Sequence, residues 1–311
     1  MKIFAWIILS IIIFIIFGLI YYLVVGEILF RNFFSRKSTT KRIFNKNIKN
    51  LINEHKIDLC WWEKVKFSRI EIKSFDQLTL VGYYHDAGSD KTVVIVHGFG
   101  GSHEEMQPYC KFFYEKNFNV LAVDNRAHGE SEGKCIGFGW LDRKDIASWI
   151  QYLNSKQPNN KILLFGLSMG ATAVCCVAGE KLPTNVCAVI SDCAFDNANK
   201  QIDFVMRDKK IVLKLFKKHL FGYTKRIHGF DIYQADAIKQ VKNTKIPILY
   251  IHGKEDYYVP IENMINLYNS TPENLRQKYL VDDAGHAMSY AVAGVLYEKK
   301  ISDFLKSRTN L

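Results

Sequence analysis

The residues of this chain best suited to chemistry form the stretch Gly166-Leu167-Ser168-Met169-Gly170. An apolar run at 161–165 precedes it, and the small apolar residues of a tightly packed helix follow it at 171–178. A Gly-x-Ser-x-Gly motif between a buried strand and a helix is a nucleophile elbow, in which the serine occupies a strained turn. The glycines have no Cβ to clash in that turn, and a helix N-terminus favours developing negative charge. We therefore expect Ser168 to be a nucleophile.

An acid and a base follow this serine along the chain. The apolar run 246–251 leads into a loop that contains Asp256, and the run 277–281 leads into a loop that contains His286. Loops at the carboxyl ends of parallel strands lie where such folds carry their sites. A serine hydroxyl is a weak nucleophile at neutral pH and needs an adjacent base, which a carboxylate orients. The sequence predicts His286 as that base and Asp256 as that carboxylate.

A glycine-rich loop offers groups that would stabilise an oxyanion. His-Gly-Phe-Gly-Gly at 97–101 follows the apolar run 92–96. Its glycines let the backbone approach an anion closely, and the N–H of Phe99 is the expected donor. The second N–H is expected from Met169, the residue after the nucleophile.

These motifs resemble those of the α/β-hydrolase superfamily, and in particular of its serine aminopeptidase-like and Bem46-like members, which often carry an N-terminal membrane anchor. The similarity extends from about residue 65 to about residue 306 and is carried by the stretches 97–102, 124–133, 166–170, 252–260 and 285–286. In this superfamily the triad follows the order Ser, Asp, His, which is the order of Ser168, Asp256 and His286. The resemblance implies the α/β-hydrolase fold with these three residues in their triad roles. Many relatives have glycine where Ala127 stands, a loop change that leaves the triad untouched.

The residue types predict hydrolysis of an ester, thioester or small amide through an acyl-serine. An acyltransferase, with an alcohol in place of water, is one alternative, and a non-catalytic binding protein is another. The complete triad argues against a non-catalytic binding protein. Dehalogenase chemistry would need a carboxylate where Ser168 stands. We expect a small-molecule or lipid-like acyl substrate, no cofactor and no metal.

Other polar residues near the motifs have competing interpretations. Asp192, after the apolar run 186–190, is a rival acid, but Asp256 sits on the usual loop. Tyr257 and Tyr258 either line the pocket or pack beside the acid.

Several histidines near the motifs are expected to be structural. His97 is interpreted as a packing residue beneath the oxyanion loop, and Arg126 and His128 as residues that fix loop geometry. The stretch His-Glu-Glu at 103–105 contains metal-ligand types, but no other residues have matching spacing, so a solvated helix start is expected.

Alternating strand and helix patterns predict a mostly parallel central sheet with flanking helices, opened by an antiparallel hairpin at 70–80. The long interval between the strands ending at 190 and starting at 246 predicts a short helical cap, at about 193–245. One face of a cap helix carries four basic residues, either as a solvated face or as a membrane contact: Lys210, Lys214, Lys217 and Lys218.

The net charge of +11 is concentrated in two short stretches. Residues 1–50 hold eight Lys and Arg against one Glu, and residues 200–226 hold nine against two acidic residues. Neither stretch resembles a groove-reading motif, so no nucleic-acid partner is expected. The seven cysteines lack zinc-site spacing and are expected to be buried thiols, which favours a reducing compartment or a cell with little disulfide usage.

Residues 3–25 contain no charged side chain. As a helix they would span roughly 34 Å, enough for a bilayer core of about 30 Å and longer than the apolar part of a signal peptide. We expect a retained single-pass anchor at 1–27, a basic juxtamembrane stalk at 28–64 and a catalytic domain at 65–311. Flanking basic residues favour a cytoplasmic catalytic domain, although anchors in related hydrolases commonly lead the domain outward.

Overall fold

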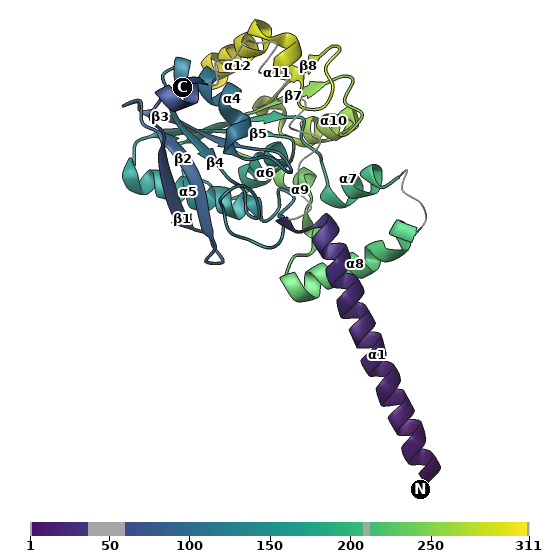
Figure 1. The fold of residues 1–311 in the computed structure, drawn as a ribbon. Coiled ribbons are helices and arrows are strands. Elements are labelled where there is room, and N and C mark those ends of the chain that lie inside the picture. Colours follow the sequence, from purple (N-terminus) through teal and green to yellow (C-terminus); the bar gives the residue numbers. More distant parts are fainter. Residues whose placement is uncertain (1, 37–59, 208–211, 310) are drawn as a thin grey trace.

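In the computed structural model, eight strands form one sheet in the order β1-β2-β4-β3-β5-β6-β7-β8. Helices cover both faces of this sheet (Figure 1). The structure describes residues 2–36, 60–207, 212–309 and 311. The strands are β1 (Ser68–Lys73), β2 (Thr79–His85), β3 (Lys91–Val96), β4 (Asn119–Val123), β5 (Lys161–Leu167), β6 (Val186–Asp192), β7 (Ile248–Gly253) and β8 (Arg276–Val281). The pairs β1–β2 and β2–β4 are antiparallel and all other pairs are parallel, so the predicted α/β-hydrolase topology with an opening hairpin is confirmed.

The central strands are apolar throughout because both of their faces are covered. In β3, Val93 and Ile95 face one helical layer, and Val94 and Val96 face the other. The first layer contains α4 (Gln107–Glu115), α11 (Ser289–Ala293) and α12 (Val295–Arg308). The second layer contains α5 (Asp142–Lys156), α6 (Met169–Ala178), α9 (Ala237–Val241) and α10 (Ile261–Ser270).

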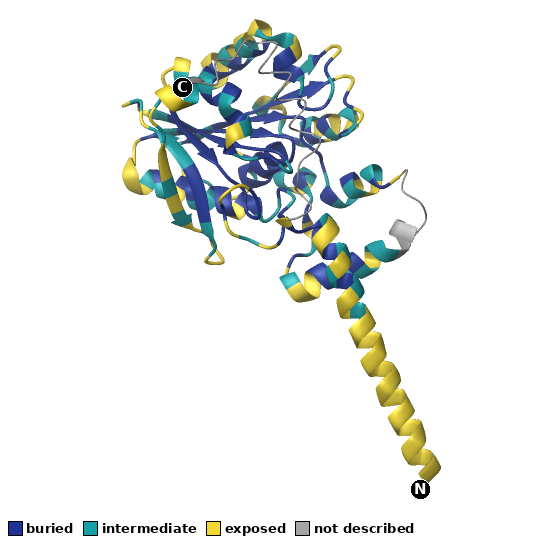
Figure 2. Ribbon diagram, viewed as in Figure 1, coloured by how far each residue is buried: buried dark blue, intermediate teal, exposed yellow. Residues whose placement is uncertain are grey.

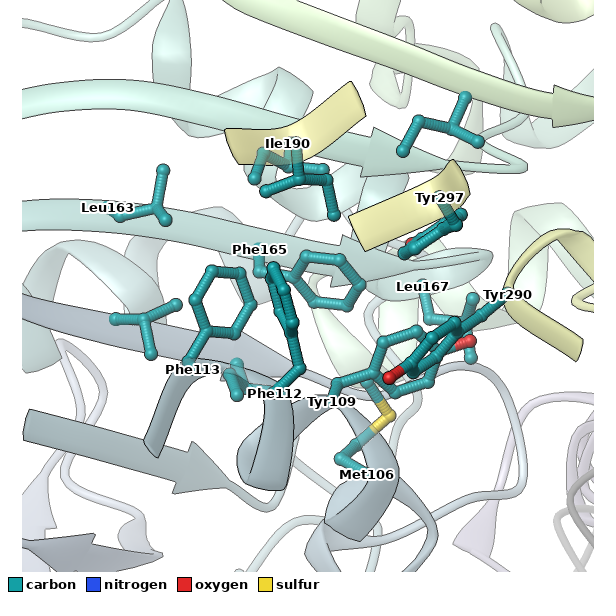
Figure 3. Close-up of a cluster of buried hydrophobic side chains, with 14 of the residues drawn as sticks. Met106, Tyr109, Phe112, Phe113, Leu163, Phe165, Leu167, Ile190, Tyr290 and Tyr297 are labelled. Carbon is teal, nitrogen blue, oxygen red and sulfur yellow. The ribbon is translucent and has the colours of Figure 1, made fainter. Parts of the chain in front are cut away.

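Aromatic side chains fill the first layer (Figure 3). Tyr109 and Phe113 of α4 pack on Phe165 of β5, and the Tyr109 ring also lies 5.4 Å from that of Tyr290. The other described short helices outside the cap are α3 (Cys60–Lys64), η2 (His103–Met106) and η4 (Glu273–Leu275), and Met106 of η2 is buried in the first layer.

The strand predicted at 246–251 begins two residues later, at Ile248. Pro247 has no N–H to donate to a neighbouring strand, so the paired segment starts after it. Its carbonyl still accepts a hydrogen bond from the N–H of Val189 at 2.9 Å.

The long connection between β6 and β7 forms a helical cap, as predicted. It contains α7 (Ala198–Val205), α8 (Val212–His228) and η3 (Ile232–Gln234). Of the four lysines expected on one helical face, Lys210 lies outside the described residues, and the side chain of Lys214 is likewise outside the description. Lys217 forms an ion pair with Asp203 at 2.5 Å, and Lys218 is exposed.

Helix α1 (Lys2–Phe33) projects from the body and crosses α8 (Figure 1). It is long and apolar enough to cross a membrane. Every residue from Lys2 to Tyr21 is exposed, whereas the following turns pack against the cap (Figure 2). The helix therefore continues beyond the expected boundary at residue 27, because its last turns have a packing partner. Residues 37–59 of the expected stalk lie outside the described part of the chain.

Candidate active site

The nucleophile elbow lies where β5 ends and α6 begins. Ser168 stands between the last residue of β5 and the first residue of α6, with a φ of 54° and a ψ of −115°. A positive φ is costly for a residue with a Cβ and persists only where the surrounding structure enforces it. The predicted strained turn at Ser168 is therefore present.

The two glycines of the motif permit close approach of neighbouring backbone. A Cβ on Gly166 would lie 2.3 Å from the carbonyl oxygen of Gly170, and a Cβ on Gly170 would lie 2.2 Å from that of Val96. Both distances are too short for any side chain. The start of α6 consequently packs against the end of β3, which brings the loop after β3 next to Ser168.

Ser168, His286 and Asp256 form a continuous hydrogen-bonded chain. The Oγ of Ser168 lies 2.9 Å from Nε2 of His286, and Nδ1 of His286 lies 2.7 Å from Oδ2 of Asp256. All three residues are buried. When Nδ1–H donates to the carboxylate, Nε2 is free to accept the serine proton, which is the tautomer a general base needs. The structure thus brings the three predicted residues together from the loops after β5, β7 and β8.

Asp256 is held by its own loop, which a second histidine supports. Its Oδ1 accepts hydrogen bonds from the N–H groups of Tyr258 and Val259, at 3.0 and 2.8 Å. Nε2 of His252 donates to the carbonyl of Val259 at 2.9 Å and lies 3.4 Å from Oδ2 of Asp256, and burial lowers the pKa of His252. These contacts fix the carboxylate that faces His286. Sequence reasoning missed His252, whose only signal is its position four residues before the acid.

The rival acid, Asp192, faces other partners. Its carboxylate accepts hydrogen bonds from the hydroxyls of Ser289 and Tyr297, at 3.1 and 2.9 Å. Burial raises the pKa of Asp192 to about 7, although these two hydrogen bonds act in the opposite direction. Its backbone carbonyl accepts the N–H of Ser168 at 2.8 Å. Asp192 therefore supports the elbow through its main chain, and its carboxylate is engaged elsewhere.

The two expected oxyanion donors lie beside the serine. Phe99 and Met169 border the same cavity as Ser168. Within residues 2–36, 60–207 and 212–309, neither N–H donates to another protein group. The N–H of Met169 also belongs to the first turn of α6, where backbone donors have no partner inside the helix. Both groups are therefore available to an anion at this position.

His97, Arg126 and His128 hold the surrounding loops, as predicted. Nε2 of His97 accepts the N–H of Asn125 at 3.0 Å, which ties the loop after β3 to the loop after β4. Arg126 forms a buried ion pair with Asp145 at 2.6 Å. Nδ1 of His128 lies 2.9 Å from the carbonyl of Arg126, and burial lowers the pKa of His128 to about 3, so its imidazole is neutral.

The expectation of a solvated helix start at 103–105 is wrong for His103, which is buried. Its Nδ1 lies 3.0 Å from Oδ1 of Asp124, and its ring stacks on that of Tyr83 at 3.8 Å. Both partners are distant in the sequence, so local patterning gives no sign of them.

Cys193 adds a thiol to the site that sequence reasoning missed. Its Sγ, an oxygen of Asp256 and a ring nitrogen of His286 lie within 4.8 Å of one another, a donor set that suits zinc. The carboxylate and the imidazole are already joined by a hydrogen bond, and burial raises the pKa of the thiol, which disfavours the thiolate ligand. We assign no metal to this group.

Ser168 borders an apolar cavity of about 260 Å³. Tyr258 lines it, with its ring 5.0 Å from that of His286, whereas Tyr257 is 76% exposed and does not. The other apolar lining residues of the catalytic body and cap include Phe138, Phe195, Ile202, Val205, Met206 and Leu220. The cavity is also lined by three residues of the N-terminal segment, which the sequence had assigned to a separate anchor and stalk: Asn32, Phe33 and Phe34.

Comparisons with known proteins agree with this architecture. Residues 87–230 match the family model described as serine aminopeptidase, S33. The protein YqkD of Bacillus subtilis is 26% identical over 247 residues, which cover 77% of this chain and 81% of that protein. The protein bem46 of Schizosaccharomyces pombe is 24% identical, over 66% of this chain and 65% of its own length.

The esterase Pf2001 of Pyrococcus furiosus has a similar fold, with a TM-score of 0.67 and 24% sequence identity. The superposition covers 81% of this chain and 96% of the esterase. The sheet order, the elbow and these similarities lead to one conclusion: the chain has the α/β-hydrolase fold, and its sequence is similar to those of Bem46-like proteins.

Proposed function

We propose that this chain is a membrane-anchored serine hydrolase that cleaves an ester, thioester or small amide through an acyl-serine. The observation that carries the proposal is the hydrogen-bonded chain from Ser168 through His286 to Asp256. The α/β-hydrolase family supports hydrolase activity in general. The apolar cavity beside the serine supports an acyl group as the part of the substrate that is bound.

The geometry suits a two-step reaction. As Ser168 Oγ attacks the acyl carbon, Nε2 of His286 takes its proton, and Asp256 stabilises the resulting imidazolium. The N–H groups of Phe99 and Met169 receive the charge that develops on the carbonyl oxygen. His286 then returns the proton to the leaving group, and water cleaves the acyl-serine by the same route.

Covalent labelling with a fluorophosphonate probe tests the nucleophile. Wild-type protein should be labelled, and Ser168→Ala should not. Ser191→Ala is a matched control, because Ser191 is a buried serine on the neighbouring strand β6. Equal labelling of the wild type and Ser168→Ala, or loss of labelling in Ser191→Ala alone, would contradict the assignment.

The dimensions of α1 support membrane anchoring. The fully exposed part, Lys2–Tyr21, contains about 20 residues, and a helix of that length spans roughly 30 Å, the thickness of a bilayer core. We place this part in the membrane and the crossing with α8 at the membrane surface. The catalytic domain then lies on the side favoured by the basic residues, the cytoplasm.

Vesicle cosedimentation tests the anchor. Full-length protein should remain with vesicles at all salt concentrations, whereas protein lacking residues 1–21 should bind anionic vesicles weakly and only at low salt, because surface charges alone remain. Reversing the exposed Lys218, Lys225 and Arg226 to Glu should weaken the remaining binding further, while the basic residues between 31 and 49 still contribute. A truncated protein that sediments like the full chain would contradict the placement of the anchor.

A further inference from the structure

The cavity beside Ser168 has a wall made by the N-terminal helix. Phe33, the last residue of α1, and its neighbours Asn32 and Phe34 line the cavity together with the cap. A second, small apolar gap between α1 and α8 is bordered by Phe33, Met206 and Leu220, which also border the main cavity. An apolar strip therefore runs from the crossing of the two helices to the nucleophile.

Phe34 fixes this wall to the catalytic body. Its side chain is 1% exposed, and its ring lies 4.9 Å from that of Phe138 and 5.9 Å from that of Phe221. Its carbonyl accepts the N–H of Ile136 at 2.8 Å, beside an antiparallel bridge between Ser35 and Cys135. Backbone pairing and ring packing thus hold the end of α1 in one position.

The preceding turns fix the helix to the cap. A Cβ on Gly26 would lie 2.2 Å from the ring of Tyr223, so the two helices are in direct contact there. The hydroxyl of Tyr223 donates to Glu27 at 2.8 Å, and Nε2 of His219 donates to the carbonyl of Tyr22 at 3.0 Å. The wall at Phe33 cannot shift without breaking these contacts.

Distance along the helix links this wall to the bilayer. Phe33 lies about 12 residues beyond the exposed part of α1, or roughly 18 Å along the axis. Apolar side chains of α1 and α8 border this path, Leu29 and Phe216 among them. A chain of methylene groups that enters from the membrane surface would remain in apolar contact on its way to Ser168.

We propose that the end of α1 is a specificity-determining wall of the active site, and that the substrate is a membrane-partitioned acyl ester whose chain lies against Phe33. This inference rests on the proposed hydrolase function. It gives the N-terminal helix a role in substrate selection in addition to anchoring.

Acyl-chain selectivity of the full-length protein in detergent micelles tests the wall. We would measure kcat/KM for p-nitrophenyl esters from two to sixteen carbons. Phe33→Trp should reduce kcat/KM for long esters roughly tenfold relative to kcat/KM for the two-carbon ester, because a filled pocket rejects extra methylenes. Asn32→Phe, which adds bulk at an exposed position of the same wall, should act in the same direction. Phe17→Trp, in the fully exposed part of α1, is the matched control.

Protection of an introduced thiol tests the same wall without catalysis. Phe33→Cys should react with a maleimide, and dodecanoic acid but not butyric acid should slow the reaction, whereas Phe17→Cys should show no such difference between the acids. An active enzyme with wild-type chain-length selectivity in both bulky variants, or equal effects of the two acids at Phe33→Cys, would overturn the inference. If the wild-type protein is not labelled by the fluorophosphonate probe but Phe33→Cys is still protected by dodecanoic acid, only the hydrolase function is refuted.

Discussion

The two walls of the cavity beside Ser168 are built in different ways. The wall at the sheet consists of short loops that follow β3, β5, β7 and β8, and polar hydrogen bonds of 2.7 to 2.9 Å join its triad residues. The wall at the helices consists mainly of apolar side chains from α1 and the cap, and packing and hydrogen bonds away from the cavity hold it in place. Under the proposed function, the first wall would carry the groups for bond cleavage, and the second would carry the shape that an acyl chain meets.

This difference separates what substitutions should do. Changes in the sheet wall should reduce turnover of every substrate, because all substrates share the reacting atoms. Changes in the helix wall should discriminate between substrates, because only those with long chains reach it. The following predictions use this contrast.

Removing the reacting residues should have the largest effect. Ser168→Ala, His286→Ala and the double variant should each reduce kcat by a similar factor, on the order of 10⁶, because residues that act as a unit are not additive. Steady-state hydrolysis of a two-carbon and a twelve-carbon ester checks this. Additive losses in the double variant would show that the two residues work independently.

The two buried acids should differ strongly. Asp256→Asn should reduce kcat by roughly 10⁴, because an amide favours the wrong tautomer of His286. Asp192→Asn should retain most activity, since its carboxylate binds Ser289 and Tyr297. The same ester assay, with labelling rates as a second measurement, distinguishes them. A reversed order would move the orienting role to Asp192.

Separating α1 from the cap should affect only long substrates. Gly26→Leu places a side chain where the ring of Tyr223 lies, whereas Gly18→Leu meets nothing within 4 Å and serves as the control. We expect roughly tenfold lower kcat/KM for a twelve-carbon ester in Gly26→Leu and no change for a two-carbon ester. Equal losses for both esters would mean that the helix supports the sheet wall as well.

The smallest expected effect is on stability. Burial raises the pKa of Asp192 to about 7, above the unfolded value of about 3.9. Between these values the folded state keeps a proton that the unfolded state has lost, so this group makes the protein less stable as the pH rises from 4 to 7. Asp192→Asn should lessen that decline. Thermal unfolding of both proteins at pH 5 and pH 8 measures this decline. If Tm falls between the two pH values by the same amount in the wild type and in Asp192→Asn, the assignment is refuted.

The sequence predicts the sheet wall well because its signals are local. Apolar runs lead into the loops that contain Asp256 and His286, and the elbow is contiguous around Ser168, so the parallel topology brings the three residues together. Errors arise where partners are distant, as for His103, whose acid partner lies 21 positions away.

The helix wall was not predicted because the sequence assigns its N-terminal residues to a membrane anchor and a stalk. Phe33 and Phe34 follow the apolar segment 3–25 and fall in the stretch predicted as a basic juxtamembrane stalk, and nothing local indicates that they contact the cap. Gly26 gives a weak hint, since a glycine inside a helix is unfavourable and can mark a place where another element approaches closely, although Gly18 of the same helix has no such neighbour. At Gly26 that neighbour is Tyr223.

The pairing of α1 with α8 also sets an order of events during synthesis. Tyr22 and His219 are in contact although 197 positions separate them. Helix α1 leaves the ribosome before α8, so their contact forms only after the much later segment has been made. Closing so long a loop carries an entropic cost and delays the contact. The cap side of the cavity is therefore expected to be among the last parts of the molecule to assemble, after the elbow strand and its helix have formed.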